Sequence, residues 1–342
     1  DTRDQCPVFY GRVIQGVKNG PSPAWLQDRL KAIGLRPISA LVDVTNFFTY
    51  DSNRPLHVFD ADKVAGGALR VHRAKGGEVF SALDDKDYTL AEGMTVISDA
   101  DGIESLGGIM GGVHSGCTDE TVNVFLEGAY FDPVRTAYTG RALKINSDAR
   151  YRFERGIDAS WTPVGIEAAS QMILDLCGGT ASEVVIAGAQ PDHARAYQLD
   201  TDRIQSLVGM ELPEAEQRVT LTALGFDLQG DMAHVPGWRP DIMGEADLVE
   251  EVARVASLTK LQGKPLPRLQ SGVPKAILSP IQRREQIARR TTASLGYNEC
   301  VSYSFIDQSA AQMFGGGSAV TMLENPISSE MSHMRPDLVP GL

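Results

Sequence analysis

Residues 41–62 read LVDVTNFFTYDSNRPLHVFDAD, and the first part of the chain is organised around this stretch. Its first half is rich in β-branched and aromatic residues, a composition that predicts a strand. The polar run 51–53 predicts a turn. Proline at position 55 disfavours a helical conformation in the residue before it, so we expect an open reversal and then a second element.

Three polar side chains stand on the two sides of this predicted reversal: Thr45, Asn46 and His57. They are placed so that they could face one pocket, which makes them candidates for binding or catalysis. The alternative for a single histidine in an apolar run is a buried ring whose nitrogen bonds a backbone carbonyl. The rest of the chain has to decide between these two interpretations.

The composition is that of a globular protein with two or three domains. The chain has 342 residues, 42% of them hydrophobic and 22% charged, and a formal net charge of −12. This charge provides no global basic field that would attract DNA or RNA, so any RNA contact needs a local patch or a partner chain. With no apolar stretch long enough to span a membrane, no signal peptide and no initiator methionine, the chain reads as a cytoplasmic piece of a longer protein. The four cysteines are widely spaced, so we expect neither disulfides nor a cysteine-based zinc site.

The order of predicted elements indicates an α+β fold with a mixed sheet and three domains. Short strands alternate with turns and helices over residues 1–190. Helix, helix, hairpin and helix follow over residues 192–263, which suggests a small winged-helix-like module. A Pro/Gly-rich linker opens the segment 264–342, where Ser279-Pro280 begins a helix and residues 301–305 read as a strand.

Three further stretches of the first domain carry residues with chemical potential. The glycine-dense run 106–112 could bring the backbone close to a ligand, but it fits neither a dinucleotide fingerprint nor a phosphate loop, and a tight turn accounts for it better. Glu127 is the only carboxylate in the apolar strand 122–131, where a charge must be paired, face a wet cavity, or lie on an exposed edge. The run 146–156 combines three arginines with two aromatic residues, which suits RNA contact, although paired surface charges are an equal alternative.

Four carboxylates lie close together in the second domain: Asp241, Asp247, Glu250 and Glu251. The last three share one face of a predicted helix, where like charges repel unless a cation or a basic partner compensates. Oxygen-only ligands would favour Mg²⁺ or Ca²⁺. Acidic residues are also common near a helix N-terminus without any metal, because they interact favourably with the helix dipole.

Five motifs, in this order and at these distances, resemble the editing domain of bacterial phenylalanyl-tRNA synthetase β subunits. They are VDVTN, RPLHVFDAD, GGIMGG, FLEGAYF and SDARYRFERG, and they span most of residues 36–156. The resemblance implies hydrolysis of tyrosine wrongly attached to tRNA(Phe). Two departures stand in the last motif, where Ser147 replaces a common threonine and Arg150 replaces a small polar residue.

The resemblance also assigns roles to individual residues, motif by motif. Thr45, Asn46 and His57 would surround the aminoacyl ester, with either His57 or a ribose hydroxyl of the tRNA activating the water. The pocket for the amino acid would be formed by Gly107, Gly111, Glu127, Ser147 and Ala149. Glu127 would meet the tyrosine hydroxyl, while Ala149 would leave room for the ring.

The second and third domains resemble later parts of the same subunit. VPGWRPDIMGEADLVEEVAR is similar to the segment in which Asp241, Asp247, Glu250 and Glu251 would hold Mg²⁺ at the contact with the α subunit. Residues 325–335 are similar to the start of a non-catalytic, class-II-synthetase-like domain. An α₂β₂ partner, tRNA(Phe) and ATP used by the α subunit are therefore implied, with no ATP bound by this chain. The alternatives are a free-standing trans-editing hydrolase and a non-catalytic RNA-binding or assembly module.

Overall fold

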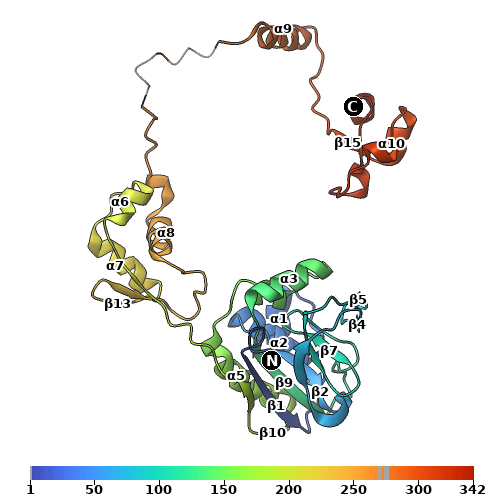
Figure 1. Ribbon diagram of the computed structural model, residues 1–342, viewed down its shortest axis with the longest axis vertical. Helices are drawn as coiled ribbons and strands as arrows, with labels where there is room; N and C mark the ends of the chain where they lie inside the picture. Colours follow the sequence, from blue (N-terminus) through green and yellow to red (C-terminus); the bar gives the residue numbers. More distant parts are fainter. Residues whose placement is uncertain (1, 268–271, 273–276) are drawn as a thin grey trace. The chain divides into compact units, whose positions relative to one another are not determined.

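The protein is described by a computed structural model that covers residues 2–267, 272 and 277–342. The chain divides into two compact units, Asp1–Gln262 and Gly263–Leu342, each considered by itself (Figure 1). The first unit carries three separate clusters of buried hydrophobic residues.

The largest core of the first unit lies against one five-stranded antiparallel sheet. β1 is at its centre, paired with β9 along its whole length on one side and with β10 and β11 on the other, and β2 pairs with the far side of β9. The strands are β1 (Val8–Gln15), β2 (His57–Asp60), β9 (Asn123–Tyr130), β10 (Thr180–Ala181) and β11 (Val185–Gly188).

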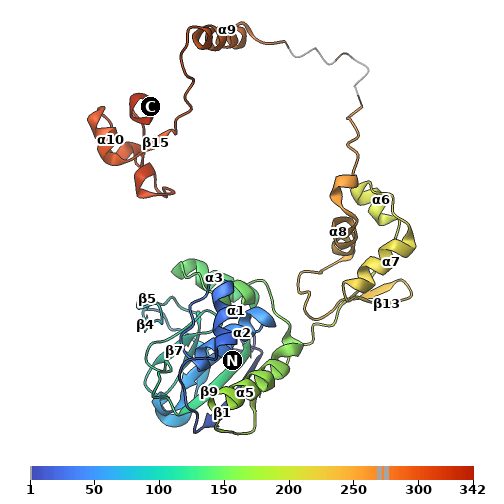
Figure 2. The ribbon, with the colours of Figure 1, turned by 180° about the vertical axis from the view of Figure 1, so that it is seen from behind.

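Three helices accompany this sheet: α1 (Ala24–Ala32), α2 (Ala40–Asp51) and α5 (Thr162–Cys177). α5 packs on β1 and β9, and α2 packs on α5 and α1. Figure 2 shows these helices in front of the sheet. The apolar side of α5 supplies Ile166, Ala169 and Ile173 to the core at helical spacing, which buries one face of the sheet.

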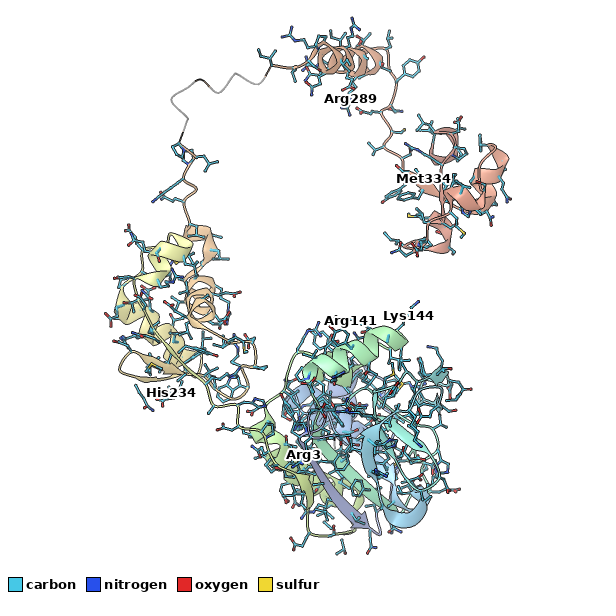
Figure 3. The ribbon with its side chains drawn as sticks, in the orientation of Figure 1. Arg3, Arg141, Lys144, His234, Arg289 and Met334 are labelled. Carbon is cyan, nitrogen blue, oxygen red and sulfur yellow. The ribbon has the colours of Figure 1, made fainter. Side chains whose placement is uncertain are left out.

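A second, smaller sheet carries the glycine-dense run. It consists of β3 (Arg70–Arg73), β6 (Thr95–Ser98), β7 (Ile103–Leu106) and β8 (Met110–Gly111), in that spatial order and all antiparallel. Beside it stand the hairpin β4 (Val79–Ser81) and β5 (Asp87–Thr89) and the helices α3 (Pro133–Leu143) and α4 (Asp148–Phe153). Arg141 and Lys144 mark the end of α3 (Figure 3).

The predicted strand in the first half of 41–62 is wrong, because these residues form α2. Leu41, Val44 and Phe48 are buried at a spacing of three and four residues, which is the period of a helix. The β-branched and aromatic content misled the propensity argument, and packing on α5 and α1 overrides it. The predicted turn at 51–53 is present, with Asn53 at φ 51°.

Two further expectations are corrected. The sheets are not mixed, because every ladder among the described residues is antiparallel. The predicted strand at 301–305 reduces to β15 (Phe305–Ile306), paired with β16 (His333–Met334). Val301 and Tyr303 are largely exposed, so no buried face holds residues 301–304 in a sheet.

The remainder of the first unit has its own hydrophobic cluster, to which α8 contributes Leu248, Val249 and Val252. The predicted helices and hairpin are present, and a third strand, β12, adds to the hairpin. The elements are β12 (Ala196–Gln198), α6 (Arg203–Val208), α7 (Glu214–Ala223), β13 (Asp227–Gln229), β14 (Met232–His234) and α8 (Glu245–Ala256).

The second unit contains α9 (Pro280–Ser294), α10 (Gln308–Met313) and the β15–β16 pair. α9 begins as predicted, because Ser279 and Gln282 form a capping box before Pro280. None of its residues is buried, and Arg289 projects from it (Figure 3). In the part of the chain that the structure describes, no helix is both long and apolar enough to cross a membrane.

Candidate functional site

The pairing of β2 with β9 places two of the predicted site residues side by side. His57 on β2 lies directly opposite Glu127 on β9 in the antiparallel register. Residues opposite each other in such a pair project to the same face of the sheet, with Cβ atoms about 4.5–5.5 Å apart. Residues 70 positions apart in sequence therefore share one site.

A cavity of about 100 Å³ opens at this pair, between β2, β9, the β7–β8 turn and α4. An apolar cavity of about 150 Å³ can hold benzene, so this space is of the order needed for part of an aromatic side chain. Its lining is Pro55, Leu56, His57, Ser105, Leu106, Gly108, Ile109, Met110, Gly111, Glu127, Phe131, Ala149 and Phe153.

Glu127 is the buried charge of this cavity. Its side chain is on a central strand and is only 5% exposed, so it is not the solvent-facing edge residue that was one alternative. Its Oε2 atom is buried without a hydrogen-bond partner. Burial raises the pKa of the Glu127 carboxyl to about 8, because the charged form loses its hydration and gains no compensating contact. Such an atom is poised to accept a donor from a ligand.

His57 is the second incompletely satisfied group. Its ring is partly exposed, but the Nε2 atom is buried and has no partner, so the alternative of a histidine satisfied by a carbonyl does not apply to that nitrogen. The ring lies edge-on to Phe59 with centroids 4.4 Å apart. Burial lowers the pKa of His57 to about 4, so the imidazole is neutral at pH 7.

Glycines let the β7–β8 turn approach these side chains. A Cβ on Gly111 would lie 2.3 Å from Cε1 and 2.7 Å from Nε2 of His57, so only glycine leaves the ring in place. Gly108 has φ +70° and also lines the cavity. Gly107 does not line it, but a Cβ there would meet the lining ring of Phe131 at 2.7 Å. The tight turn expected for this run is present, with Ile109 N donating to Leu106 O.

α4 supplies the opposite wall. Ser147 caps this helix by accepting from Arg150 N at 3.1 Å, and its Oγ donates to Ile109 O at 2.6 Å, which ties α4 to the β7–β8 turn. Ala149, two residues later, lines the cavity, whereas Ser147 is outside the lining. The Arg150 side chain turns away to Ile145 O and Glu154, so this departure from the family pattern leaves the cavity open.

Thr45 and Asn46 are not brought to this cavity. Both are on α2, where Thr45 Oγ1 donates to Val42 O at 2.8 Å within the helix. Neither residue is among the lining side chains. Their expected position rested on a strand followed by a reversal, and the helix in that place changes the direction of both side chains.

Several lining residues were missed by sequence reasoning, above all Ser105, Phe131 and Phe153. Phe131 and Phe153 stand in the FLEGAYF and SDARYRFERG motifs but were given no role there, Ser105 stands in none of the motifs, and the fold brings the three together. Arg54 was also missed: it is 1% exposed behind the cavity wall, bonded to Thr162 Oγ1 and to Ala129 O. Desolvation lowers the pKa of its guanidinium to about 10. Arg54 is the first residue of the RPLHVFDAD motif, and its place in that motif was an available signal.

The arginines of 146–156 are held within the fold. Arg152 lies over the Tyr50 ring at 4.2 Å, and Arg155 lies over Tyr151 at 3.7 Å while pairing with Glu154. These contacts are those of the paired-charge alternative. These intramolecular contacts do not test whether the run binds RNA, and RNA binding stays a prediction.

The four carboxylates of the second domain are not arranged around a common ion position. Asp241 and Glu251 both pair with Arg239, and Glu251 also pairs with Arg254. These two guanidinium groups lower the pKa of Glu251 to about 2. Asp247 accepts from Met243 N at 2.7 Å instead. With Arg239 between two of the four expected ligands, this arrangement does not fit Mg²⁺.

A larger, apolar cavity of about 360 Å³ lies on the sheet near β1 and β9, with Phe9, Phe125 and Val185 in its walls. None of its lining residues is titratable, so it lacks the groups for acid–base or nucleophilic chemistry. The smaller cavity at His57 and Glu127 is the better candidate for an active site.

Comparison with known proteins matches three family models along the chain. They are the B3/4 domain over residues 5–178, the tRNA synthetase B5 domain over residues 197–257, and the phenylalanyl tRNA synthetase beta chain CLM domain over residues 266–342. The phenylalanine–tRNA ligase beta subunit of Ruegeria pomeroyi is 72% identical over 342 residues, which are 100% of this chain and 43% of that protein. The Cereibacter sphaeroides protein of the same name is 68% identical over 337 residues, 98% and 42% of the two chains.

The chain thus spans less than half of the length of these relatives. A solved N-terminal fragment of the phenylalanyl-tRNA synthetase beta subunit from Pyrococcus horikoshii has a TM-score of 0.36 and 16% sequence identity, over 73% of this chain and 71% of that one.

Proposed function

Because the chain belongs to the phenylalanine–tRNA ligase beta-subunit family, and its B3/4 domain covers residues 5–178, we propose that this domain hydrolyses tyrosyl-tRNA(Phe). The observation that carries the proposal is the pair His57 and Glu127, adjacent on β2 and β9, each with a buried polar atom that has no partner. Unsatisfied buried groups cost about 1–3 kcal/mol each, and a ligand that satisfies them recovers this free energy.

Glu127 provides the selectivity. A tyrosine ring in the cavity would place its hydroxyl against the Glu127 carboxyl, where the O–H would donate a hydrogen bond to the unpartnered Oε2 atom. This bond is strongest to the ionised form, so the bound hydroxyl would lower the pKa of Glu127 that burial raises. Phenylalanine would bury the same carboxyl without a donor. A site built for a hydroxyl rejects the analogue that lacks it by up to about 10⁴–10⁵-fold. A second site of this kind can therefore hydrolyse the tyrosyl ester and spare the phenylalanyl ester.

In the proposed reaction a water molecule attacks the ester carbonyl carbon. A C–O bond to water forms, the C–O bond to the ribose breaks, and a proton from the water ends on the ribose oxygen. With its pKa lowered to about 4, His57 is a weak proton acceptor at pH 7. Its neutral ring is better suited to orient the water or the ester through Nε2, while a ribose hydroxyl of the tRNA assists the proton transfer.

Mischarged tRNA tests this proposal directly. The chain is incubated with tyrosyl-tRNA(Phe), and the loss of the ester is followed for the wild type and for His57→Ala. We expect the wild type to accelerate hydrolysis and the variant to lose most of that acceleration. His234→Ala is a matched control, because His234 is an exposed histidine on β14, away from the cavity. Equal rates for wild type and His57→Ala would contradict the proposal.

The other assignments concern the rest of the chain and its partners. Residues 192–263 would form a winged-helix-like module, and residues 264–342 the start of a class-II-synthetase-like domain that contacts the α subunit. The holoenzyme would then charge tRNA(Phe) with ATP bound by the α subunit. Magnesium bound by Asp241, Asp247, Glu250 and Glu251 would require Arg239 to release two of them, so it is proposed only for the assembled complex.

A further inference from the structure

A second cluster of ligand-type side chains lies in the β6–β8 region, outside the cavity. It consists of Asp99 after β6, Glu104 on β7 and His114 after β8, each with one potential ligand atom. These three atoms lie within 4.8 Å of one another, and no other group of three meets this condition among the residues with described positions.

The backbone holds the three residues in place. Asp99 closes the β6–β7 turn by accepting from the N–H groups of Asp101 and Gly102, and its second oxygen accepts from Ala65 N at 2.8 Å. Gly112 N donates to Glu104 O at 2.7 Å, which fixes the segment leading to His114 on the edge of β7. The cluster is therefore preformed by the sheet and does not depend on a flexible loop.

Glu104 is the unusual member of this group. Its side chain is 3% exposed, and Oε1 lies 3.1 Å from His114 Nδ1. The other oxygen of the same carboxylate, Oε2, is buried and has no hydrogen-bond partner. An unsatisfied carboxylate oxygen in such a position is costly unless something binds it. His114 is exposed and Asp99 is half-buried, so the cluster is open to solvent on one side.

We propose that Asp99, Glu104 and His114 bind a divalent transition-metal ion of the Zn²⁺ type, with water completing the coordination. One imidazole and two carboxylates are common ligands of zinc, whereas Mg²⁺ and Ca²⁺ prefer oxygen ligands alone. Tetrahedral ligands about 2.0–2.2 Å from Zn²⁺ lie about 3.4 Å from one another, and Glu104 Oε1 and His114 Nδ1 are already 3.1 Å apart. The exposed side chain of His114 can adjust to the remaining difference.

The ion has a structural consequence for the proposed editing site. Glu104 is next to Ser105, and the strand continues through the turn to Gly111, which packs on His57. A metal that joins the end of β6, β7 and the segment after β8 would hold the β7–β8 hairpin against β6. It would thus stiffen one wall of the cavity without contacting the substrate.

The test is a titration of the chelator-treated full chain with Zn²⁺ by calorimetry and with Co²⁺ by visible absorption. We expect one ion per chain, at least tenfold weaker binding for His114→Ala, and loss of the site in Glu104→Gln. Zn²⁺ at a concentration that saturates the wild type should raise the Tm of the wild type more than that of His114→Ala. His234→Ala and Cys300→Ser remove an exposed histidine and the exposed thiol, and should bind like the wild type.

Because His114 is an exposed side chain, His114→Ala keeps the test valid even if Glu104→Gln folds poorly. Absence of Zn²⁺ binding by the wild type would overturn the proposal. So would binding by His114→Ala with the affinity of the wild type, since the ion would then be held elsewhere. Neither readout uses hydrolysis, so this result is independent of whether the cavity edits tRNA.

Discussion

At the scale of single residues, the cavity keeps two side chains in the protonation states that burial favours. Glu127 is pushed towards its neutral form and His57 is also held neutral, both mainly by loss of hydration. Such pKa shifts are common at functional sites. The buried groups destabilise the folded state, and a ligand that hydrogen-bonds to them would remove this cost. The empty site is therefore a source of instability that depends on pH.

The first prediction concerns the stability of Glu127→Gln. The pKa of Glu127 is raised from 4.5 to about 8 in the folded state, so the folded state holds the proton more tightly than the unfolded state. The resulting contribution to the free energy of unfolding is fully present below pH 4.5 and is lost as pH rises through 8. Glutamine has no such titration. In urea unfolding, the free energy of unfolding of Glu127→Gln relative to that of the wild type should rise between pH 5 and pH 9, by about 1–3 kcal/mol. An identical pH dependence of the two proteins would contradict this account of Glu127.

The second prediction concerns Gly111→Ala. Gly111 has an ordinary backbone conformation, so alanine strains only the contact with His57, where the new Cβ would lie 2.3 Å from Cε1. The ring must move by about 1 Å, and a displacement of that size in a catalytic group can reduce the rate by about 100-fold. Hydrolysis of tyrosyl-tRNA(Phe) and urea unfolding are measured together.

The matched control for Gly111→Ala is Gly20→Ala, because a Cβ at Gly20 meets no atom within 4 Å and that residue also has no positive φ. We expect Gly20→Ala to retain the wild-type rate. A Gly111→Ala protein that is folded and hydrolyses at the wild-type rate would show that the position of His57 is unimportant.

At the scale of elements, β9 and α2 show what sequence can and cannot predict. β9 was predicted from an apolar run with β-branched and aromatic residues. In the structure most of its residues are buried. α2 was mispredicted from the same kinds of residues, although Leu41, Val44 and Phe48 already stood at helical spacing. Periodicity was the better signal there. The candidate site residues divide in the same way: His57 and Glu127, on strands, line the cavity, whereas Thr45 and Asn46, on the mispredicted element, do not, and the roles of all four stay predictions.

The third prediction concerns the ion pairs that join α8 to the preceding loop. Arg239 donates to Asp241 and to Glu251, which is 5% exposed on α8. Removing one partner of a buried pair leaves the other charge incompletely compensated, here with Arg254 alone. Arg239→Met should lower the free energy of unfolding by about 1–3 kcal/mol. Arg254→Met, at a side chain that is 50% exposed, should cost less.

The measurement is urea unfolding followed by circular dichroism. Since the pKa of Glu251 is lowered to about 2, its contribution is present above pH 4.5 and is lost as pH falls towards 2. The difference between wild type and Arg239→Met should therefore shrink in acid. A cost that stays the same at pH 3 and pH 7 would mean that this pair is not what stabilises α8.

At the scale of the whole molecule, the proposed hydrolytic site lies in the first unit, where β2, β9, β7–β8 and α4 converge. The second unit buries few residues: among those the structure describes, they are Ile306, Ala311, Gly317 and His333. The sequence predicted α9 and its cap, because a capping box is formed by neighbouring residues. It did not predict that residues 301–304 form no strand, because this depends on which residues cover the segment. The chain also spans less than half of the length of its relatives, so the surfaces that bind partner chains have to be studied in the full-length subunit.

The most direct test of the central claim is the ratio of hydrolysis rates for tyrosyl- and phenylalanyl-tRNA(Phe) in the wild type and in Glu127→Ala. We expect the wild type to prefer the tyrosyl ester strongly, and Glu127→Ala to lose most of this preference while Glu92→Ala, an exposed carboxylate, keeps it. An unchanged ratio in Glu127→Ala would contradict the account, because the cavity would then not recognise the hydroxyl through Glu127.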